Sequence, residues 1–330
     1  MTTPTSTLLP TRLVKLQSFK ETAWGTSGSA TAKWMGVQPT PTFKPYLHPE
    51  ILDEQRASLA PAFLTAITKK GGEFSFNQHS TYEDIIFQLA GGLLGGVTPT
   101  GGPVYVWSFP AGLTSQWAIQ SYSFEFGYDI GVICAAGATI QKWGIKAEPG
   151  KQWESSISGF YKTHTQNGTF TAGLTDRTVE AILHGTTALS MDAAAGTVGT
   201  TAFAGTLVGF ALEVDNGVKP VWTGDLEPTT FSNDKIVPTL ELKLLYTSAV
   251  KTFLTTNWFN NIGSLIRLKS SSGTKYAQID FSGVLAEDPT LYGNVEGAQI
   301  LDIKLTGILD TGTFANVIKA EVANAVATIP

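Results

Sequence analysis

The residues of this chain that could do chemistry are acidic side chains on the polar faces of predicted strands. A pair of carboxylates at a suitable separation could cleave a glycosidic bond, and a cluster of them could bind calcium. No Asp-x-Asp-x-Asp-Gly loop accompanies them. The simplest interpretation is a solvated strand face. The four acids are Glu125, Asp129, Asp280 and Asp302.

No other arrangement in the sequence indicates catalysis or a bound metal. The chain has no GxSxG nucleophile elbow and no HExxH pair, and the glycine-rich segment 91–103 lacks the Lys and Ser/Thr of a phosphate-binding loop. Cys134 is the only cysteine, so no disulfide can form within one chain. We therefore predict no enzyme, no catalytic, cofactor or metal site, and scattered polar roles for the histidines, His48, His79, His164 and His184.

Composition and charge narrow the class of protein. The chain has 330 residues, of which 42% are apolar, which is enough for two hydrophobic cores. Its formal net charge is −5 and no basic run occurs, so tight nucleic-acid binding is not expected. No apolar stretch reaches the ~20 residues that cross a bilayer, and the first residues do not form a signal peptide. We expect no membrane contact and synthesis in a cytoplasm.

The alternation of apolar and polar residues predicts a mainly β protein whose two halves resemble each other. Phe74 and Phe76 alternate in one strand, and Leu240 and Leu242 alternate in another, 166 residues later. A short helical pattern follows each strand, and four further strands follow each helix. In the fifth pair of elements, which is the fourth pair of strands, Ile140, Trp143 and Ile145 match Ile300, Ile303 and Leu305.

This echo suggests a duplicated unit and a division into four segments. A Thr/Pro/Gly-rich arm with two tryptophans would pack on its own domain or, slightly favoured, on a neighbouring copy. The glycine-rich loop is the other candidate for reaching a neighbour. The predicted segments are 1–50 (arm), 51–165 (first β module), 166–203 (Thr/Gly/Ala-rich connector) and 204–330 (second β module). The residues proposed for contacts between subunits or rings are Trp24, Trp34, Gly101 and Gly102.

Three stretches of the chain are similar to a known family. KETAWGT at 20–26, ATIQKWGIKAEPGKQWESSISGFY at 138–161 and IRLKSSSGTKYAQIDFSGVL at 266–285 resemble the tail tube proteins of long, non-contractile bacteriophage tails. The resemblance implies β-sandwich or barrel-like units, each with a flanking helix. It also implies a structural virion protein of the phage tail, made in the host bacterial cytoplasm.

The resemblance further implies how the subunits assemble. Family members with two units per chain form trimeric rings with pseudo-sixfold symmetry, and members with one unit form hexamers; the echo favours the trimer. Stacked rings would enclose the tape measure protein and then DNA passing to the host. Phosphate is repelled by carboxylates, so some of Glu125, Asp129, Asp280 and Asp302 are expected to face that channel.

Two other functions stay open on the sequence alone. Eight tryptophans together with the carboxylates could belong to a protein that binds or cleaves carbohydrate. That function requires Trp side chains lining a groove beside Glu or Asp. Another virion β protein, such as a capsid decoration or tail terminator subunit, fits the sequence nearly as well as a tube subunit does.

Overall fold

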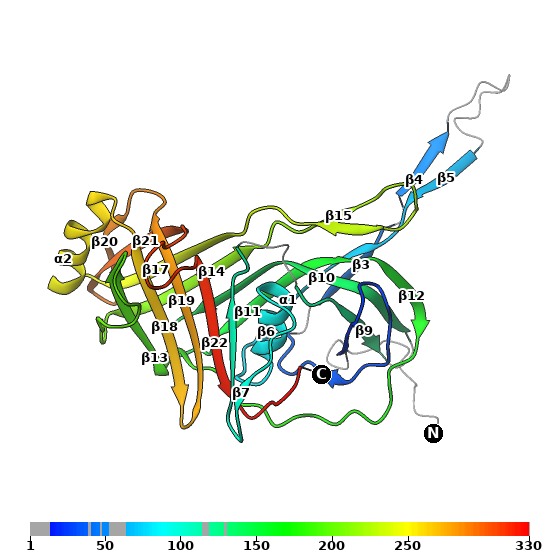
Figure 1. Ribbon diagram of the computed structural model, residues 1–330, viewed down its shortest axis with the longest axis horizontal. Coiled ribbons are helices and arrows are strands. Elements are labelled where there is room, and N and C mark those ends of the chain that lie inside the picture. The colour runs from blue at the N-terminus through cyan, green and yellow to red at the C-terminus, as the bar shows by residue number, and fades with distance from the viewer. Residues whose placement is uncertain are drawn as a thin grey trace, which may run out of the picture.

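The computed structural model describes residues 14–38, 41–46, 48–52, 64–113, 119–128 and 131–329. Antiparallel strands dominate these ranges, so the prediction of a mainly β fold is confirmed (Figure 1). The elements before residue 170 are β1 (Lys15–Lys20), β2 (Ala32–Lys33), β3 (Thr42–Pro45), β4 (His48–Leu52), β5 (Leu64–Lys69), β6 (Gly72–His79), α1 (Ile85–Gly92), β7 (Thr100–Gly101), β8 (Tyr105–Pro110), β9 (Tyr122–Tyr128), β10 (Gly131–Ala147), β11 (Glu154–Tyr161) and β12 (Thr163–Gly168). The later ones are η2 (His184–Thr186), β13 (Thr187–Ala193), β14 (Leu207–Asp215), β15 (Lys219–Val221), β16 (Thr230–Ser232), β17 (Val237–Leu245), α2 (Ser248–Thr256), η3 (Trp258–Asn260), β18 (Ser264–Ser272), β19 (Lys275–Leu285), β20 (Thr290–Val295), β21 (Ala298–Gly307) and β22 (Ile318–Asn324).

The strand β10 belongs to two sheets at once. Its first part pairs with β9 and β12, and its second part pairs with β11 and β14. Register shifts between Ala135 and Ala138 and between Ile140 and Lys142 separate the two parts. Such bulges bend a strand and increase its twist. In this way β10 connects the sheet β2-β1-β9-β10-β12 to the sheet β3-β6-β11-β10-β14.

Aromatic side chains fill the space between these two sheets. Trp34 meets Phe76 edge-on at 5.2 Å between ring centroids, and Phe74 meets Phe124 at 5.3 Å. The helix α1 is buried along its whole length. At its end Trp143 donates a hydrogen bond from Nε1 to the Gly92 carbonyl. A Cβ on Gly92 would lie 2.5 Å from the Trp143 ring, so glycine here permits close packing as well as ending the helix.

The second half of the chain repeats the pairing pattern of the first. In the first half β9 pairs with β1 and β10, β10 with β12 and β11, β11 with β6, and β6 with β3. In the second half β18 pairs with β13 and β19, β19 with β22 and β21, β21 with β17, and β17 with β14. A helix follows β6 in one half and β17 in the other. The sequence echo therefore marks strands in equivalent positions.

The register agrees with this equivalence and corrects one expected match. Thr290 of β20 stands opposite Asp302 of β21. In the first half, the pairing of β10 with β11 occupies the equivalent place in the sheet. Hence β19 and β20 together correspond to β10, and β21 corresponds to β11. The expected match of β10 with β21 is wrong because β8 has no counterpart and pairs with β22 instead of with its own half. The equivalent pairs are Phe74–Gly159 with Leu240–Leu305 and Phe76–Ile157 with Leu242–Ile303.

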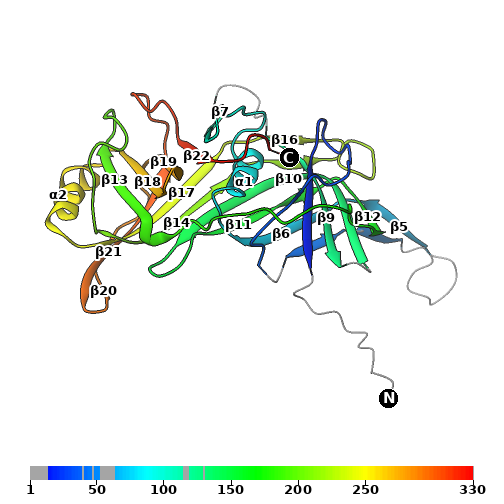
Figure 2. The same ribbon diagram turned by 90° about the horizontal axis from the view of Figure 1, so that it is seen from below.

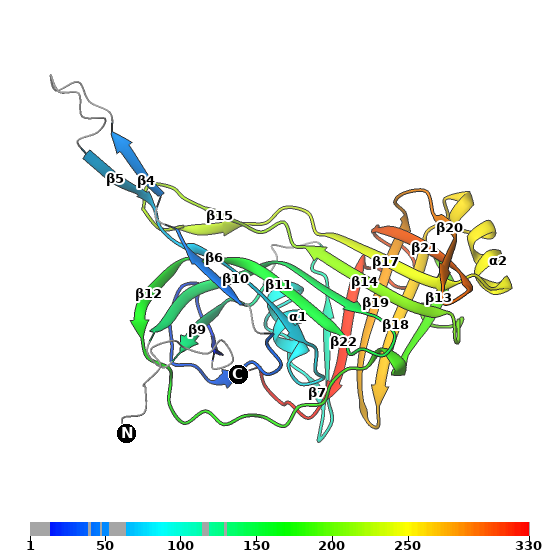
Figure 3. The same cartoon turned by 180° about the vertical axis from the view of Figure 1, so that it is seen from behind.

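The structure also moves the expected segment boundaries. The described residues at 14–38 and 41–46 do not form a separate arm, because β1 and β3 are integral strands of the two sheets. The expected connector contains β13, which pairs with β18. We call residues 14–168 the first unit and residues 187–324 the second unit. Two further hairpins, β4–β5 and β15–β16, project from the body on the same side (Figures 1 and 3).

Candidate assembly surface

One continuous sheet runs through both units. Its strands, in spatial order, are β3, β6, β11, the second part of β10, β14, β17, β21 and β20. We call it the wall sheet; its long central strands lie side by side in Figure 2. In β6 and β17 the apolar residues face the cores, whereas Glu73, Ser75, Glu241 and Lys243 face outward. We call this outward surface the wall face.

The wall face carries both signs of charge in nearly equal number. Lys142 pairs with Asp215, Lys146 with Glu154 and Lys304 with Glu241, each at 3.1 Å. These pairs cross between neighbouring strands, so the charges are interleaved and form no single-sign patch. Its acids are Glu73, Glu154, Glu213, Asp215, Glu241 and Asp302, and its lysines are Lys44, Lys142, Lys146, Lys243 and Lys304.

Of the four acids among which channel-facing residues are expected, Asp302 lies on the wall face. It stands opposite Lys243 on β17 and borders a 610 Å³ hollow there. Asp129 lies outside the described residues. The other two are buried inside the chain.

Glu125 and Asp280 are buried and have their hydrogen-bond partners inside the chain. Glu125 accepts hydrogen bonds from the Thr171 amide at 2.7 Å and from Gln17 Nε2 at 3.0 Å. Asp280, 2% exposed, accepts hydrogen bonds from Nε and one Nη of Arg267, at 2.6 and 2.8 Å. The alternation that placed them on polar strand faces was right, but other elements cover those faces. Their burial corrects the expectation that they line a channel.

The residues expected to contact neighbouring copies are divided in the same way. Trp34 is 4% exposed and belongs to the core of its own unit, which corrects its expected role between subunits. Trp24 is half-buried and donates to the Gly137 carbonyl at 3.0 Å, so it too packs on its own unit. Gly101 and Gly102 lie at the exposed β7–β8 turn. Whether that turn reaches a neighbour stays a prediction.

Glu21 has a structural role that the sequence did not reveal. Its side chain is buried and accepts four hydrogen bonds, from the Gly25 and Gly137 amides and from the hydroxyls of Ser121 and Ser123, at 2.7–2.9 Å. The carboxylate thereby ties the KETAWGT turn to the β9–β10 hairpin. A buried carboxylate is stable only with such a set of donors. The only sequence signal for this role is the KETAWGT motif itself.

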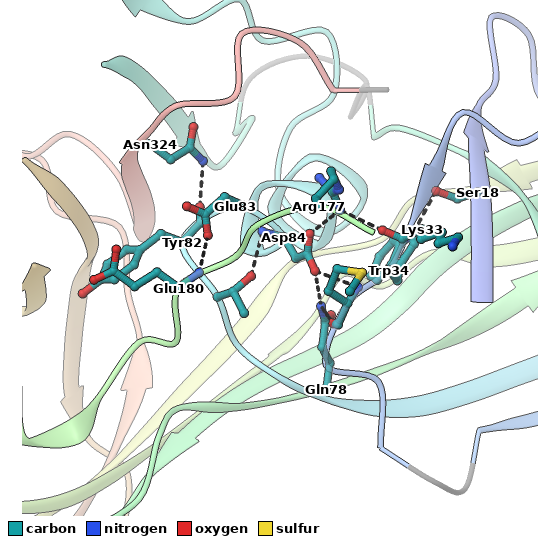
Figure 4. A network of polar contacts seen from close by, with 12 residues as sticks. Ser18, Lys33, Trp34, Gln78, Tyr82, Glu83, Asp84, Arg177, Glu180 and Asn324 are labelled. Atoms are coloured by element: carbon teal, nitrogen blue, oxygen red, sulfur yellow. Dashed lines mark hydrogen bonds and ion pairs between the residues drawn. The ribbon is translucent and has the colours of Figure 1, made fainter. Parts of the chain in front are cut away.

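A polar network fixes the place where the two units meet (Figure 4). Asp84, at the start of α1, is fully buried and pairs with Arg177, which also donates to the Lys33 carbonyl. The Met35 amide and Gln78 Nε2 donate to its other oxygen. Burial raises the pKa of Asp84 to about 6, although the positive charge of Arg177 opposes the shift.

The same network continues into the second unit. Lys275, in the β18–β19 hairpin, lies 2.7 Å from Glu83 and 3.0 Å from Glu180. Glu83 also accepts the amide of Glu180, and Asn324 at the end of β22 donates to the Tyr82 carbonyl at 2.7 Å. We call these contacts of Tyr82, Glu83, Asp84, Arg177, Glu180, Lys275 and Asn324 the joint. It holds the first unit, the connector and the second unit in one relative orientation.

No protein-family model matches this chain, and no curated protein matches it either. Over the described ranges, no group of three or more His, Cys, Asp and Glu side chains could hold a metal ion. In the same ranges no helix has the length and apolarity needed to cross a bilayer.

Proposed function

We propose that this chain is a structural subunit of a tube, the tail tube of a long-tailed bacteriophage, and not an enzyme. The observation that carries the proposal is the wall sheet. Two equivalent units are fused edge to edge into one sheet that is apolar on one face and polar on the other. A sheet built this way is suited to be one sector of a channel wall.

Repetition of one unit supports a closed ring. When the same unit is added again with the same displacement, the contact is head-to-tail, and such contacts close into rings if the rotation permits. Closure of a sheet also removes its exposed edges. Two units per chain then favour a trimeric ring with pseudo-sixfold symmetry, with a hexamer as the alternative. Stacked rings would form the tube of the virion tail.

The wall face is suited to line the channel. Three of its lysines are occupied by carboxylates, so passing phosphates would gain little by displacing those partners. This replaces the expected acidic lining by a charge-balanced one. The tape measure protein, and afterwards DNA, would move along this surface without tight binding.

The tryptophans give little support to a carbohydrate-binding function. Five of them are buried in the described ranges, so they cannot form an exposed stacking platform beside the carboxylates. They are Trp34, Trp107, Trp143, Trp153 and Trp258.

Electron microscopy of the purified protein tests the proposal. We expect rings or tubes with a central channel, and tubes of the same diameter in the virions that carry this protein. A chain that stays monomeric at all concentrations and salt conditions, and is absent from virion tails, would contradict it.

A further inference from the structure

We infer that β20 of one copy pairs with β3 of the next copy, in an antiparallel register that places Thr290 opposite Lys44. The inference rests on the proposed function, because the partner is a second copy of this chain. Its basis is the contact that joins the two units within one chain. The equivalent strands at the two outer edges of the wall sheet have no such contact in the described part of the chain.

The contact inside the chain is the pairing of β10 with β14, which joins the first unit to the second. Residues of the second part of β10 stand opposite β14 in an unbroken antiparallel ladder. In this ladder Gly144 pairs with Glu213 and Ile145 pairs with Leu212. The ladder therefore shows how the end of one unit receives the beginning of another.

The beginning of the first unit is β3, which is equivalent to β14. Phe43 of β3 stands opposite Phe74, as Leu212 of β14 stands opposite Leu240. One position along, Lys44 faces Glu73 and corresponds to Glu213. Lys44 and Glu213 are both exposed, and Phe43 and Leu212 are both buried, so the facing also agrees.

The end of the second unit is β20, which is equivalent to the second part of β10. Gly144 of β10 stands opposite Ser156 of β11, and Thr290 of β20 stands opposite Asp302 of β21. Ser156 and Asp302 are equivalent because each lies one residue before the partner of an echo position, Ile157 or Ile303. Thr290 therefore corresponds to Gly144.

Both edges are open in the described part of the chain. There β3 pairs with β6 alone and β20 pairs with β21 alone, whereas the equivalent strands β14 and β10 each have a neighbour on both sides. Tyr292 on β20 is 63% exposed. Unpaired edges that carry apolar side chains invite pairing with another chain. The strands β3 and β20 form the two opposite edges of the wall sheet. One copy can therefore pair through β3 with one neighbour and through β20 with another.

Cysteine cross-linking tests the register. In a Cys134→Ala background, Lys44→Cys and Thr290→Cys are combined, and the assembled protein is oxidised with diamide, which takes up the two thiol hydrogens as the disulfide forms. Directly opposed residues in neighbouring strands have Cα atoms roughly 4.5–5.5 Å apart, within disulfide range. We expect most of the protein to run as covalently linked multimers on non-reducing gels, and as single chains after reduction.

The matched control combines Glu73→Cys with Thr290→Cys. Glu73 lies opposite Lys44 but one strand further from the edge, so its Cα would be roughly 9–10 Å from Thr290 of the next copy, too far for a disulfide. Equal cross-linking of the control pair, or rings that form without Lys44–Thr290 cross-links, would overturn the register while leaving the proposed tube intact. Absence of both rings and cross-links would overturn the inference and the proposed function together.

Discussion

At the scale of single residues, three buried acids hold loops in place. Glu21 and Glu125 accept backbone amides from the segments that cross them, and Asp192 accepts the amides of Gly199, Thr200 and Thr201. Hydrogen bonds from neutral donors to a buried carboxylate can offset the cost of removing its charge from water. Of these three, the sequence predicted only Glu125 on a polar strand face, and it could not show which loops fold over any of them.

Replacing Glu21 by Gln should destabilise the protein without changing its fold. The NH2 group of the Gln side chain would face N–H and O–H groups that now donate to the carboxylate. At least one of these buried donors would then lose its hydrogen bond. We expect a loss of about 2–3 kcal/mol in the free energy of unfolding, measured by urea denaturation. The exposed Glu73→Gln variant is the control and should change it by less than about 0.5 kcal/mol. Equal effects of the two substitutions would contradict the anchoring role of Glu21.

Asp84 should make stability depend on pH. Its folded pKa of about 6 lies above the ordinary value of 3.8, so its contribution to stability is fully present below pH 3.8 and is lost as the pH rises through about 6. The change is at most about 3 kcal/mol. The free energy of unfolding, measured by urea denaturation between pH 4 and pH 8, should therefore fall less steeply with rising pH in Asp84→Asn than in the unmodified protein.

Asp176→Asn is the matched control for Asp84→Asn. Asp176 lies in the connector next to Arg177 and pairs with Lys33, but its side chain is 71% exposed. Its replacement should leave the pH dependence as it is. An unchanged slope in Asp84→Asn would show that the carboxyl of Asp84 does not titrate in this range.

At the scale of elements, the sequence predicted the repeat but not the register that defines it. The alternation in β6 and β17 and the helix after each strand were visible in the sequence. The equivalence of β10 with β19 plus β20 was not, because an inserted hairpin shifts the count and Pro289 interrupts the second copy of the strand. The joint was also hidden, since its residues come from four distant segments.

Lys275→Met should loosen the joint. It removes the cation between Glu83 and Glu180 and leaves the buried carboxylate of Glu83 without its charged partner. We expect the free energy of unfolding to fall by about 2–4 kcal/mol. In calorimetry the unfolding transition should broaden or split as the two units uncouple. Lys304→Met is the control, because its pair with Glu241 is exposed and should contribute less than about 1 kcal/mol. A single sharp transition at the original temperature in Lys275→Met would contradict this role of the joint.

At the scale of the whole molecule, the wall sheet is the feature that runs through both units. One face packs on two cores and the other is polar and carries both signs of charge, which is what the proposed sector of a channel wall requires. Composition predicted a β protein with little affinity for nucleic acid. It could not predict which acids lie on the wall face, since that depends on how the two units join.

Making the wall face basic should impair passage of DNA but not assembly. Glu213→Lys with Asp302→Lys changes the charge of the face by +4 per chain while leaving the cores untouched. We expect tubes of normal diameter, DNA retention that weakens as salt is raised, and a fall in infectivity of at least tenfold. Glu50→Lys with Asp225→Lys, which adds the same charge in the two projecting hairpins outside the wall sheet, is the control. Equal infectivity of the two double variants would contradict the proposed lining.

The most direct test of the central claim is rotational averaging of electron micrographs of the assembled protein. We predict closed rings whose end views show six similar sectors around a channel, with threefold symmetry when the two units are distinguished, and with the wall face inward. Rings whose inner surface is formed by another part of the chain, or assemblies with two-fold contacts and no channel, would contradict it.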